Sequence, residues 1–526
     1  AEILRNNWID FLCVGEGIKA WPELLSAIER GSKTNGIRNI VTRENASFVL
    51  EEQRNKLVQI SAPEGEVNIG DSLALDHLSC RQAHLSPREA NLDDLPFMDR
   101  GLVYNNTEFR HRYKRTMITS FGCPFRCAYC FEHQHNLLYS GLGRIRRWLS
   151  VDRFLDELEY VKKGWDTRFF KFYDDIFPPF PIPAEIAWHE EFCSKYPARI
   201  GLPFHILTRC DLVVALKRKG INVIADWKKA GLASLTMSIE SGNPFIHNYI
   251  ITRDMDMQDI VEAFSIANKE GVPTFPNTIL GIPAPILPYE NDPYFKAKLS
   301  KVARDLEILK KVNGARADME KAAAGINEWL SDGQHNRRNG KKALIGALRS
   351  LGLRHSHWDY NVESVDFTLN RFPGFAEFPS LFPYPKTRIT EWCIDRGDFD
   401  GNYEKLHASY QTKSPFSCYS KYEKTVLQNL SLLGTFLTLF TGSRNRLMRA
   451  LNKPLQKLLL YRLSKITYPW ATKSYLWLYM VSKVYMHRAR VYPIRYSIRE
   501  RLRFYRQMFE LDVWKQFKAR KKFFRG

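Results

Sequence analysis

The strongest constraint on the fold is an alternation of apolar runs and helical patterns that begins at Arg115. The apolar runs have the length and composition of buried β-strands, and amphipathic stretches of helical period lie between them. Strands that alternate with helices form βαβ units, whose strands lie parallel in one sheet. We therefore predict an α/β fold in which the sheet curls into a full or partial (β/α) barrel. The strand candidates are RTMITSFG (115–122), RFFKFYDDIF (168–177), LPFHILTRC (202–210), LASLTMSIESG (232–242) and VPTFPNTILGIP (272–283).

The segments on both sides of this alternation have other patterns. Residues 1–35 contain a strand and an amphipathic helix, which we expect to end a Rossmann-like α/β domain, and residues 36–110 have the character of an irregular linker. Residues 111–400 are predicted to form the barrel, with a helical insertion at about 290–355. Two further segments, VDFTLNRF (365–372) as a strand and LFPYPKTRITEWCIDRG (381–397), resume the barrel after it. Residues 401–526 are helical, aromatic and basic, and are predicted to form a C-terminal domain.

The amino-acid composition favours a globular protein with a large hydrophobic core and no disulfide framework. With 526 residues, of which 44% are hydrophobic, the chain can bury a large core. It has no uncharged apolar run of about eighteen residues, so we expect a cytoplasmic protein. The nine cysteines are an odd number and mostly scattered, so they do not make a disulfide framework. The formal charge of +21 could attract nucleic acid, an anionic membrane or acidic substrates, although a basic tail most often gives only a solvated surface.

Three of the cysteines lie in one short turn, FGCPFRCAYCFEH (121–133). Their C-x3-C-x2-C spacing can hold three irons of one cubane cluster, and the fourth iron would then be open to another ligand. We therefore predict that Cys123, Cys127 and Cys130 are metal ligands. Structural zinc is less favoured because it usually takes four ligands in two separated pairs. A ferredoxin-like carrier would need a fourth cysteine nearby, and a chance meeting of three cysteines in the core is less favoured still.

The cysteine turn resembles the signature of radical S-adenosylmethionine (SAM) enzymes, in which an aromatic residue precedes the last cysteine, as Tyr129 does here. The signature also follows the first predicted barrel strand, as it does in that family. The resemblance implies that the open iron of a 4Fe-4S cluster chelates the amino and carboxylate groups of SAM. Reduction of the cluster then cleaves SAM into methionine and a 5′-deoxyadenosyl radical, which abstracts hydrogen from the substrate.

The same resemblance assigns SAM contacts to the carboxyl ends of the barrel strands, where the loops gather. Asp174 and Asp175 end the second strand and are expected to accept hydrogen bonds from the SAM ammonium, with a helix N-cap as the alternative role. Glu240 and Ser241 end the fourth strand and would bind the SAM amino group and the ribose hydroxyls. Tyr129 would lie near the adenine.

Two further cofactor-binding candidates lie downstream. Arg253 is similar to an arginine that pairs with the SAM carboxylate, although an exposed arginine that opens a helix is as often only solvated. Gly281 belongs to NTILGIP, which resembles the segment that packs under the adenine. The Gly-Glu-Thr that usually follows this segment is absent and the insertion begins instead, which puts the substrate side of the barrel in doubt. The sequence indicates no further catalytic residue.

The segment DFLCVGEGIKAWPELLSAIERG (10–31) resembles the last strand and helix of the cobalamin-binding domain that precedes many radical SAM enzymes. LDDLPFMDRGLV (92–103) resembles the linker that follows that domain, and LFPYPKT (381–387) resembles the end of the sixth strand. The chain is therefore identified as an N-terminally truncated member of this subfamily, with the cobalamin-contacting loops expected upstream. The resemblance implies cobalamin-dependent methylation or rearrangement of a small-molecule or lipid-like substrate.

Two other functions stay open from the sequence. One is an RNA-modifying enzyme of the methylthiotransferase kind, favoured by the positive charge, and the other is a degenerate protein that holds an iron–sulfur cluster without catalysis. Since no second cluster motif or RNA-binding domain is recognisable, nucleic acid is not the expected partner. The resemblance implies a reductant such as flavodoxin or ferredoxin. The aromatic and basic segment 475–506 suits contact with a membrane surface, or a helical domain that covers a barrel opening.

Overall fold

The computed structural model describes residues 8–45, 85–331, 338–372, 374–406, 413–441 and 446–508, so parts of the predicted linker and basic tail lie outside it. At its centre is a parallel sheet of four strands in the order β3-β6-β7-β8. The predicted α/β class is confirmed, and the order in space follows the order in the chain, as in a barrel built from successive βα units. The strands are β3 (Lys114–Met117), β6 (Phe169–Phe172), β7 (Phe204–Thr208) and β8 (Leu232–Met237).

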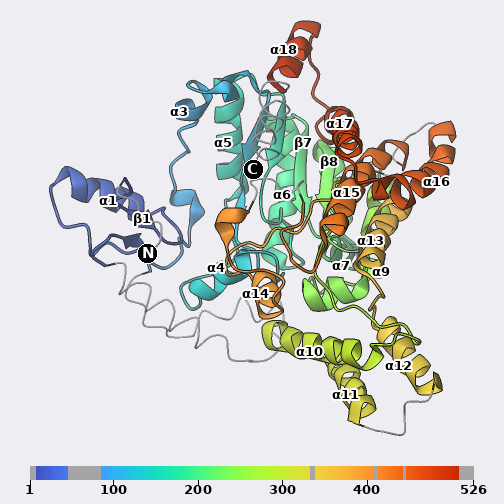
Figure 1. The fold of residues 1–526 in the computed structure, drawn as a ribbon. Coiled ribbons are helices and arrows are strands. Elements are labelled where there is room, and N and C mark those ends of the chain that lie inside the picture. The colour runs from blue at the N-terminus through green and yellow to red at the C-terminus, as the bar shows by residue number, and fades with distance from the viewer. Residues whose placement is uncertain are drawn as a thin grey trace.

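The helices that connect these strands cover one face of the sheet, with α5 and α6 beside the strands in Figure 1. Alternate strand residues such as Met117, Phe172 and Leu235 point into this helical layer and are buried with Phe154 and Phe192. Burial of each such large side chain contributes about 1.5–3 kcal/mol. The opposite side of the sheet, toward the barrel interior, is called the inner face below. The helices are α5 (Val151–Gly164), α6 (Pro183–Arg199), α7 (Cys210–Arg218), α8 (Val223–Ala230) and α9 (Met257–Lys269).

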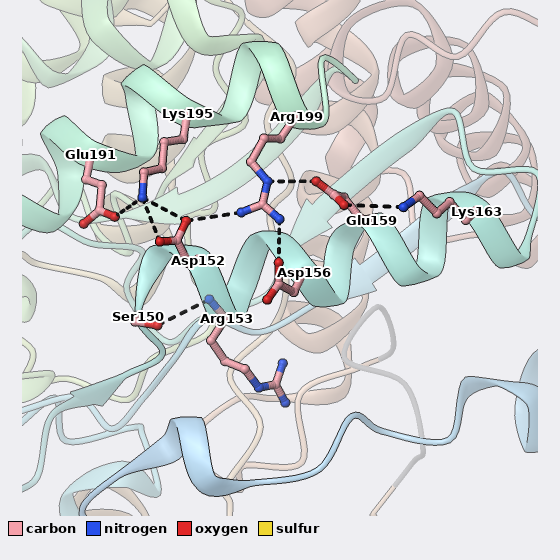
Figure 2. Close-up of polar contacts among 9 residues, drawn as sticks. All are labelled: Ser150, Asp152, Arg153, Asp156, Glu159, Lys163, Glu191, Lys195 and Arg199. Carbon is pink, nitrogen blue, oxygen red and sulfur yellow. Dashed lines mark hydrogen bonds and ion pairs between the residues drawn. The ribbon is translucent and has the colours of Figure 1, made fainter.

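A network of ion pairs joins α5 to α6 at the surface (Figure 2). Arg199 contacts Asp152, Asp156 and Glu159 at 3.2, 2.5 and 2.8 Å between nitrogen and oxygen. Lys195 contacts Asp152 at 2.8 Å. Solvent screens such exposed pairs, so each contributes little to the free energy of unfolding. The buried aromatic side chains beneath the network therefore supply most of the attraction between these helices and the sheet.

Beyond β8 the sheet continues only through isolated bridges. Residues 272–283, all described by the structure, were predicted as a strand but form no continuous one. Pro273, Pro276 and Pro283 lack the N–H that a regular ladder requires. The barrel is therefore partial, and residues 377–380 supply its last edge. The isolated parallel bridges that extend the sheet are Leu235–Thr274, Glu240–Thr278, Asn277–Glu377 and Leu280–Ser380.

The prediction of a strand at residues 365–372 is wrong. These residues fall at the end of α13 (His357–Arg371), whose N-cap Ser356 accepts a hydrogen bond from the backbone N–H of Asp359. Val362, Val365 and Leu369 recur at helical spacing and are buried on one face of this helix. Segment 381–397 likewise contains a helix, α14 (Arg388–Asp395), after an extended start.

Three helices occupy the region where the sequence predicts a helical insertion. They are α10 (Phe295–Asn313), α11 (Ala317–Ser331) and α12 (Arg338–Ser350), and they project from the barrel at the lower right of Figure 1. Leu299 and Leu306 of α10 are buried in one hydrophobic cluster with Trp392 of α14. An ion pair between the buried side chains of Asp305 and Arg396, 3.2 Å apart, joins α10 to the residues after α14.

The N-terminal residues form a small unit of β1 (Leu12–Cys13), α1 (Ala20–Glu29) and β2 (Ile40–Val41). The predicted strand and helix are present, but β1 pairs antiparallel with β2, which the sequence placed in the irregular linker. The linker region also contains α3 (Arg100–Tyr104). A second antiparallel pair, β4 (Ser120–Phe121) and β5 (Arg147–Trp148), lies next to this unit. Arg147 Nη1 donates to Glu16 at 3.0 Å and joins the two.

The C-terminal part is helical, with α15 (Lys421–Thr441), α16 (Arg446–Tyr461), α17 (Pro469–Met486) and α18 (Ile498–Met508). Helix α15 is buried along most of its length and packs against α13, α16 and α17. After α17, a π-helical turn, η9 (His487–Val491), packs against β8. Glu500 of α18 accepts hydrogen bonds from Tyr113 and Arg168 at 2.7 and 2.9 Å. Within the described residues, no helix has both the length and the apolar composition needed to cross a membrane.

Candidate active site

The three cysteines of the predicted cluster motif lie on the loop between β4 and α4 (Glu132–Leu138), just after the carboxyl end of β3. Gly122 begins this loop in the left-handed region, with φ of +85°, and a Cβ there would lie 2.0 Å from the carbonyl oxygen of Ile145. Only glycine allows this close approach. Asn136 Nδ2 donates to the carbonyl of Cys123 at 2.7 Å and ties the loop back to α4.

Segments distant in sequence hold the middle of the cysteine loop. The N–H of Ala128 donates to the carbonyl of Ile251 at 2.9 Å, and its carbonyl accepts from the N–H of Ile389 at 3.0 Å. Thr252 Oγ1 donates to the carbonyl of Arg126, 126 residues earlier, at 2.8 Å. The positions of the cysteines therefore depend on the chain after β8 and on α14, as well as on the motif itself.

Burial and neighbouring thiols raise the pKa values of Cys123 and Cys130, and two arginines lie beside Cys127. The pKa of Cys123 is raised to about 12, chiefly by burial and to a lesser extent by the neighbouring Cys127. Burial also raises the pKa of Cys130 to about 12, and Cys127 again adds to the shift. Two guanidinium groups donate to Sγ of Cys127, that of Arg209 at 3.8 Å and that of Arg253 at 3.7 Å. A bound metal is therefore needed to make thiolates of Cys123 and Cys130 at neutral pH.

This arrangement fits an iron–sulfur cluster better than a single zinc ion. Thiolates are the ligands that such clusters require, and two cationic donors at one sulfur offset negative charge there. In the described part of the chain, no three His, Cys, Asp or Glu side chains are close enough to bind one metal ion. Each cysteine of a cubane binds a different iron, so its ligands do not need to converge on one ion.

Tyr129, Glu240 and Arg253 meet beside Cys127. The Tyr129 hydroxyl donates to Glu240 Oε1 at 2.9 Å, and Arg253 Nη1 donates to the same hydroxyl at 3.2 Å. Burial raises the pKa of Glu240, and the charge of Arg253 opposes that shift. The backbone of Glu240 has φ of +63°, an uncommon conformation for a residue with a Cβ that is concentrated at ligand sites. Arg253 Nε is buried and has no hydrogen-bond partner among the described residues, so one donor remains for a ligand.

Asp174 lies in a different environment from the one expected for a SAM ligand. Its Oδ1 accepts from the N–H of Thr119 at 3.0 Å and from the N–H and hydroxyl of Ser120 at 2.5 and 2.6 Å. Burial raises its pKa to about 7, while the Ser120 hydrogen bonds act in the opposite direction. The Asp174 carboxylate thus stabilises the junction of β3 and β4 through Oδ1. Its Oδ2 has no hydrogen-bond partner within the described structure. The neighbouring Asp175 is exposed and is the more accessible acceptor at this strand end.

Two other candidates, Ser241 and Gly281, are held by α13. Ser364 Oγ lies 3.2 Å from Ser241 Oγ and accepts from the N–H of Gly242 at 3.1 Å. Asn361 Oδ1 accepts from the N–H of Gly281 at 2.7 Å. Helix α13 therefore supports both the residues that follow β8 and the extended segment that contains Gly281.

The sequence analysis missed three of these side chains. Arg209 follows the third strand, in LTRC, and its strand-end position is a signal that could have identified it. Ser364 and Asn361 lie in the region after the insertion, where no sequence motif marks them.

Comparison with known proteins gives an independent view of the same residues. Residues 117–296 match the radical SAM superfamily, and this span includes the cysteine turn, Glu240 and Arg253. An uncharacterized methyltransferase of Pyrococcus horikoshii is 25% identical over 280 residues, which are 52% of this chain and 50% of that protein. The chain thus spans about half the length of this curated relative.

Solved structures show a more distant similarity. The radical SAM methyltransferase TsrM from Kitasatospora setae is 14% identical, with a TM-score of 0.34 over 57% of this chain and 50% of that one. The cobalamin-dependent SAM radical enzyme OxsB is 13% identical, with a TM-score of 0.47 over 95% of this chain and 67% of that one. Both TM-scores are below 0.5, so these similarities do not by themselves define the reaction of this chain.

Proposed function

Because the chain carries a radical SAM domain over residues 117–296, we propose that it cleaves SAM reductively to form a 5′-deoxyadenosyl radical. The observation that carries this proposal is the meeting of Tyr129, Glu240 and Arg253 beside Cys127, although these residues are far apart in the sequence. A buried carboxylate and a buried guanidinium together complement the ammonium and carboxylate of an amino acid.

The family implies a 4Fe-4S cluster and SAM as cofactors, and the cysteine turn would supply the cluster ligands. Cys123, Cys127 and Cys130 would hold the cluster, which when bound supplies the electron for cleavage and an open iron for SAM. Arg209 and Arg253 would keep their hydrogen bonds to Cys127 Sγ. Hydrogen bonds and positive charge at a cluster sulfur favour the reduced state, so these arginines would raise the reduction potential.

The residues around Cys127 are suited to orient SAM. Glu240 would accept hydrogen bonds from the SAM ammonium, and Arg253 would turn its free donor toward the SAM carboxylate. The Tyr129 hydroxyl is hydrogen-bonded to both side chains, and its ring would face the adenine. Asp175 is the remaining exposed carboxylate at the mouth and would contact the ammonium from the second strand end.

Iron content and electron paramagnetic resonance test the proposal without a known substrate. After anaerobic reconstitution, we expect about four irons per chain and a spectrum of the reduced cluster that changes when SAM is added. Cys127→Ala should lose most of the iron, whereas Cys193→Ala, at a half-buried cysteine of α6 outside the turn, should keep it. A fully loaded cluster whose spectrum is the same with and without SAM would contradict the proposal.

The finer proposal is methyl transfer that uses cobalamin. It is supported by the relative named as a methyltransferase and by the resemblance of residues 10–31 to the end of a cobalamin-binding domain. The test is to incubate the full-length protein with reduced cobalamin and SAM that carries a deuterated methyl group. Recovery of deuterated methylcobalamin and S-adenosylhomocysteine would support the proposal. If SAM is cleaved but cobalamin stays unmethylated, the methyl-transfer proposal fails and reductive cleavage stands.

A further inference from the structure

A row of polar side chains crosses the inner face of the parallel sheet. The strand register aligns Thr116 with Lys171, Lys171 with His205, and His205 with Ser234. These residues alternate with the buried apolar residues that face the helices, so they point toward the barrel interior. Lys114 lies two residues before Thr116 on the same face of β3. The barrel interior thus contains two lysines from adjacent strands.

The upper part of the inner face is accessible. Ile118 and Tyr173, which continue the inward-pointing positions of β3 and β6, are 43% and 53% exposed. Thr116 is also exposed. Lys171, which is level with Thr116, and Lys114, two residues earlier on β3, are half-buried. The inner face is therefore open to solvent on the mouth side of the two half-buried lysines.

The lower part of the inner face is closed by η9 and the residue after it. The ring of Tyr492 lies 5.2 Å from that of His205, and the Ser234 hydroxyl donates to the carbonyl of Val491. His487 packs edge-on against Tyr492 with ring centroids 5.6 Å apart. Its Nε2 is buried and has no hydrogen-bond partner among the described residues. The C-terminal part therefore forms the floor of the interior.

The two lysines have aromatic neighbours but no anionic partner in the described part of the chain. Lys114 Nζ lies 3.9 Å from the centre of the Tyr492 ring, and Lys171 Nζ lies 4.0 Å from that of Tyr173. The nearby carboxylate, Glu377, is already engaged by Lys483 at 2.7 Å. Burial lowers the pKa of Lys171 to about 7, and repulsion by Lys114 adds to the shift. Burial likewise lowers the pKa of Lys114 to about 8.

We propose that Lys114 and Lys171 bind an anionic group of the substrate, a phosphate or a carboxylate, at the floor of the barrel interior. This inference rests on the proposed SAM cleavage, because it assigns a substrate class to that same interior. His205 and His487 lie next to the lysines, and His487 Nε2 offers a further polar contact. A bound anion would satisfy ammonium groups that otherwise lose solvation without an ionic partner.

The position of the lysines also sets the length of the substrate. Lys171 lies three residues before Asp174, which stands at the mouth of the barrel. At about 3.3 Å per residue, this places the lysine backbone about 10 Å below the mouth. The carbon that reacts would therefore be separated from the anionic group by several bonds.

Trace reductive methylation with formaldehyde and a borane, read by peptide mass spectrometry, tests the lysine site on the full chain. Inorganic phosphate and acetate are the two probes, and no SAM or reductant for the cluster is added. A bound anion stabilises the charged ammonium, and an upward pKa shift of one unit at pH 7 slows labelling of Lys171 about fivefold. Lys229, whose side chain is 82% exposed, serves as the internal reference.

We expect saturable protection of Lys114 and Lys171 by at least one probe, with Lys229 unchanged. Protection by phosphate alone identifies a phosphate group, and protection by acetate alone identifies a carboxylate. Lys171→Gln should remove the protection of Lys114, whereas Lys229→Gln should leave it intact. Absence of protection, or equal slowing at Lys229, overturns the lysine site. Because labelling does not depend on SAM cleavage, 5′-deoxyadenosine formation reports separately on the proposed function.

Discussion

Arg253 and Cys127, 126 positions apart in the sequence, are joined by a hydrogen bond of 3.7 Å from Nη1 to Sγ. The same nitrogen donates to the Tyr129 hydroxyl at 3.2 Å. Arg253 therefore links the predicted cluster ligand to the predicted SAM contacts. A change at this side chain should alter both the cluster and SAM binding, which separates its role from that of a residue that touches only one of them.

Arg253→Gln is expected to weaken SAM binding about ten- to hundredfold, because one charge-assisted hydrogen bond is worth about 1.5–3 kcal/mol. It should also shift the reduction potential of the cluster to a more negative value, since a cationic donor to sulfur is lost.

Arg209→Gln is the matched control, because Arg209 also donates to Cys127 Sγ but makes no hydrogen bond to Tyr129 in the described structure. It should shift the potential and weaken SAM binding much less than Arg253→Gln, because Arg209 donates only to the backbone carbonyl of Arg253, at 3.0 Å. Redox titration and equilibrium binding measure the two effects, and identical behaviour of the two variants would contradict this assignment.

Glu240→Gln tests the proposed ammonium contact. Loss of the carboxylate charge should weaken SAM binding about tenfold or more, while the iron content stays at the parent value. Ser364→Ala, which removes a hydrogen bond to the backbone of Gly242 without touching Glu240, should have a smaller effect on SAM binding. Iron analysis and SAM binding by calorimetry check both variants. A Glu240→Gln protein with parent affinity would exclude Glu240 from the SAM site.

Gly122→Ala should disrupt the start of the cysteine loop. A Cβ would lie 2.0 Å from the Ile145 carbonyl oxygen, and φ of +85° is unfavourable for alanine. We expect a loss of about 2–4 kcal/mol in the free energy of unfolding and poor iron incorporation. Gly164→Ala, where an added Cβ meets nothing within 4 Å, should be close to neutral. Denaturant titration and iron analysis decide, and equal stability of the two variants would refute the close-approach argument.

The lowered pKa of Lys171 predicts how the free energy of unfolding changes with pH. Its pKa is lowered to about 7 in the folded state, mainly by burial, so the unfolded chain binds a proton that the folded chain lacks between about pH 7 and pH 10.4. The free energy of unfolding should therefore rise with pH in this window through this group. Lys171→Met should be more stable than the parent by about 2–4 kcal/mol at pH 7 in anion-free buffer, with most of this difference lost by pH 10. Urea titrations of both proteins across this range measure the difference, and a constant difference would contradict the lowered pKa.

The strands of the central sheet could be predicted because their short segments are rich in apolar residues and contain no proline. Residues 272–283 have a similar apolar character, but three prolines limit them to isolated bridges. At residues 365–372, apolar Val365, Phe367 and Leu369 alternate with polar residues, which is the pattern typical of a β-strand. The helical spacing appears only when Val362 is included, because α13 begins eight residues before that segment.

The candidate site was predictable where residues follow strands. Glu240 and Arg253 come after β8 and meet Tyr129 because carboxyl ends of parallel strands share one edge. Their roles as SAM ligands stay predictions. Asp174 also follows a strand, but its hydrogen bonds to Ser120 depend on the short β4–β5 pair, which the sequence did not indicate. The site of Lys114 and Lys171 could not be predicted from the sequence either. The barrel floor beside them is closed by Tyr492, which is more than 300 residues away in the chain.

The most direct measurement of the central claim is 5′-deoxyadenosine by mass spectrometry after anaerobic cluster reconstitution and addition of dithionite and SAM. We predict that the parent chain forms 5′-deoxyadenosine and methionine, and that Cys127→Ala forms neither above background. If a parent chain with its full complement of iron forms no 5′-deoxyadenosine, the cysteine turn does not perform radical SAM chemistry in this chain.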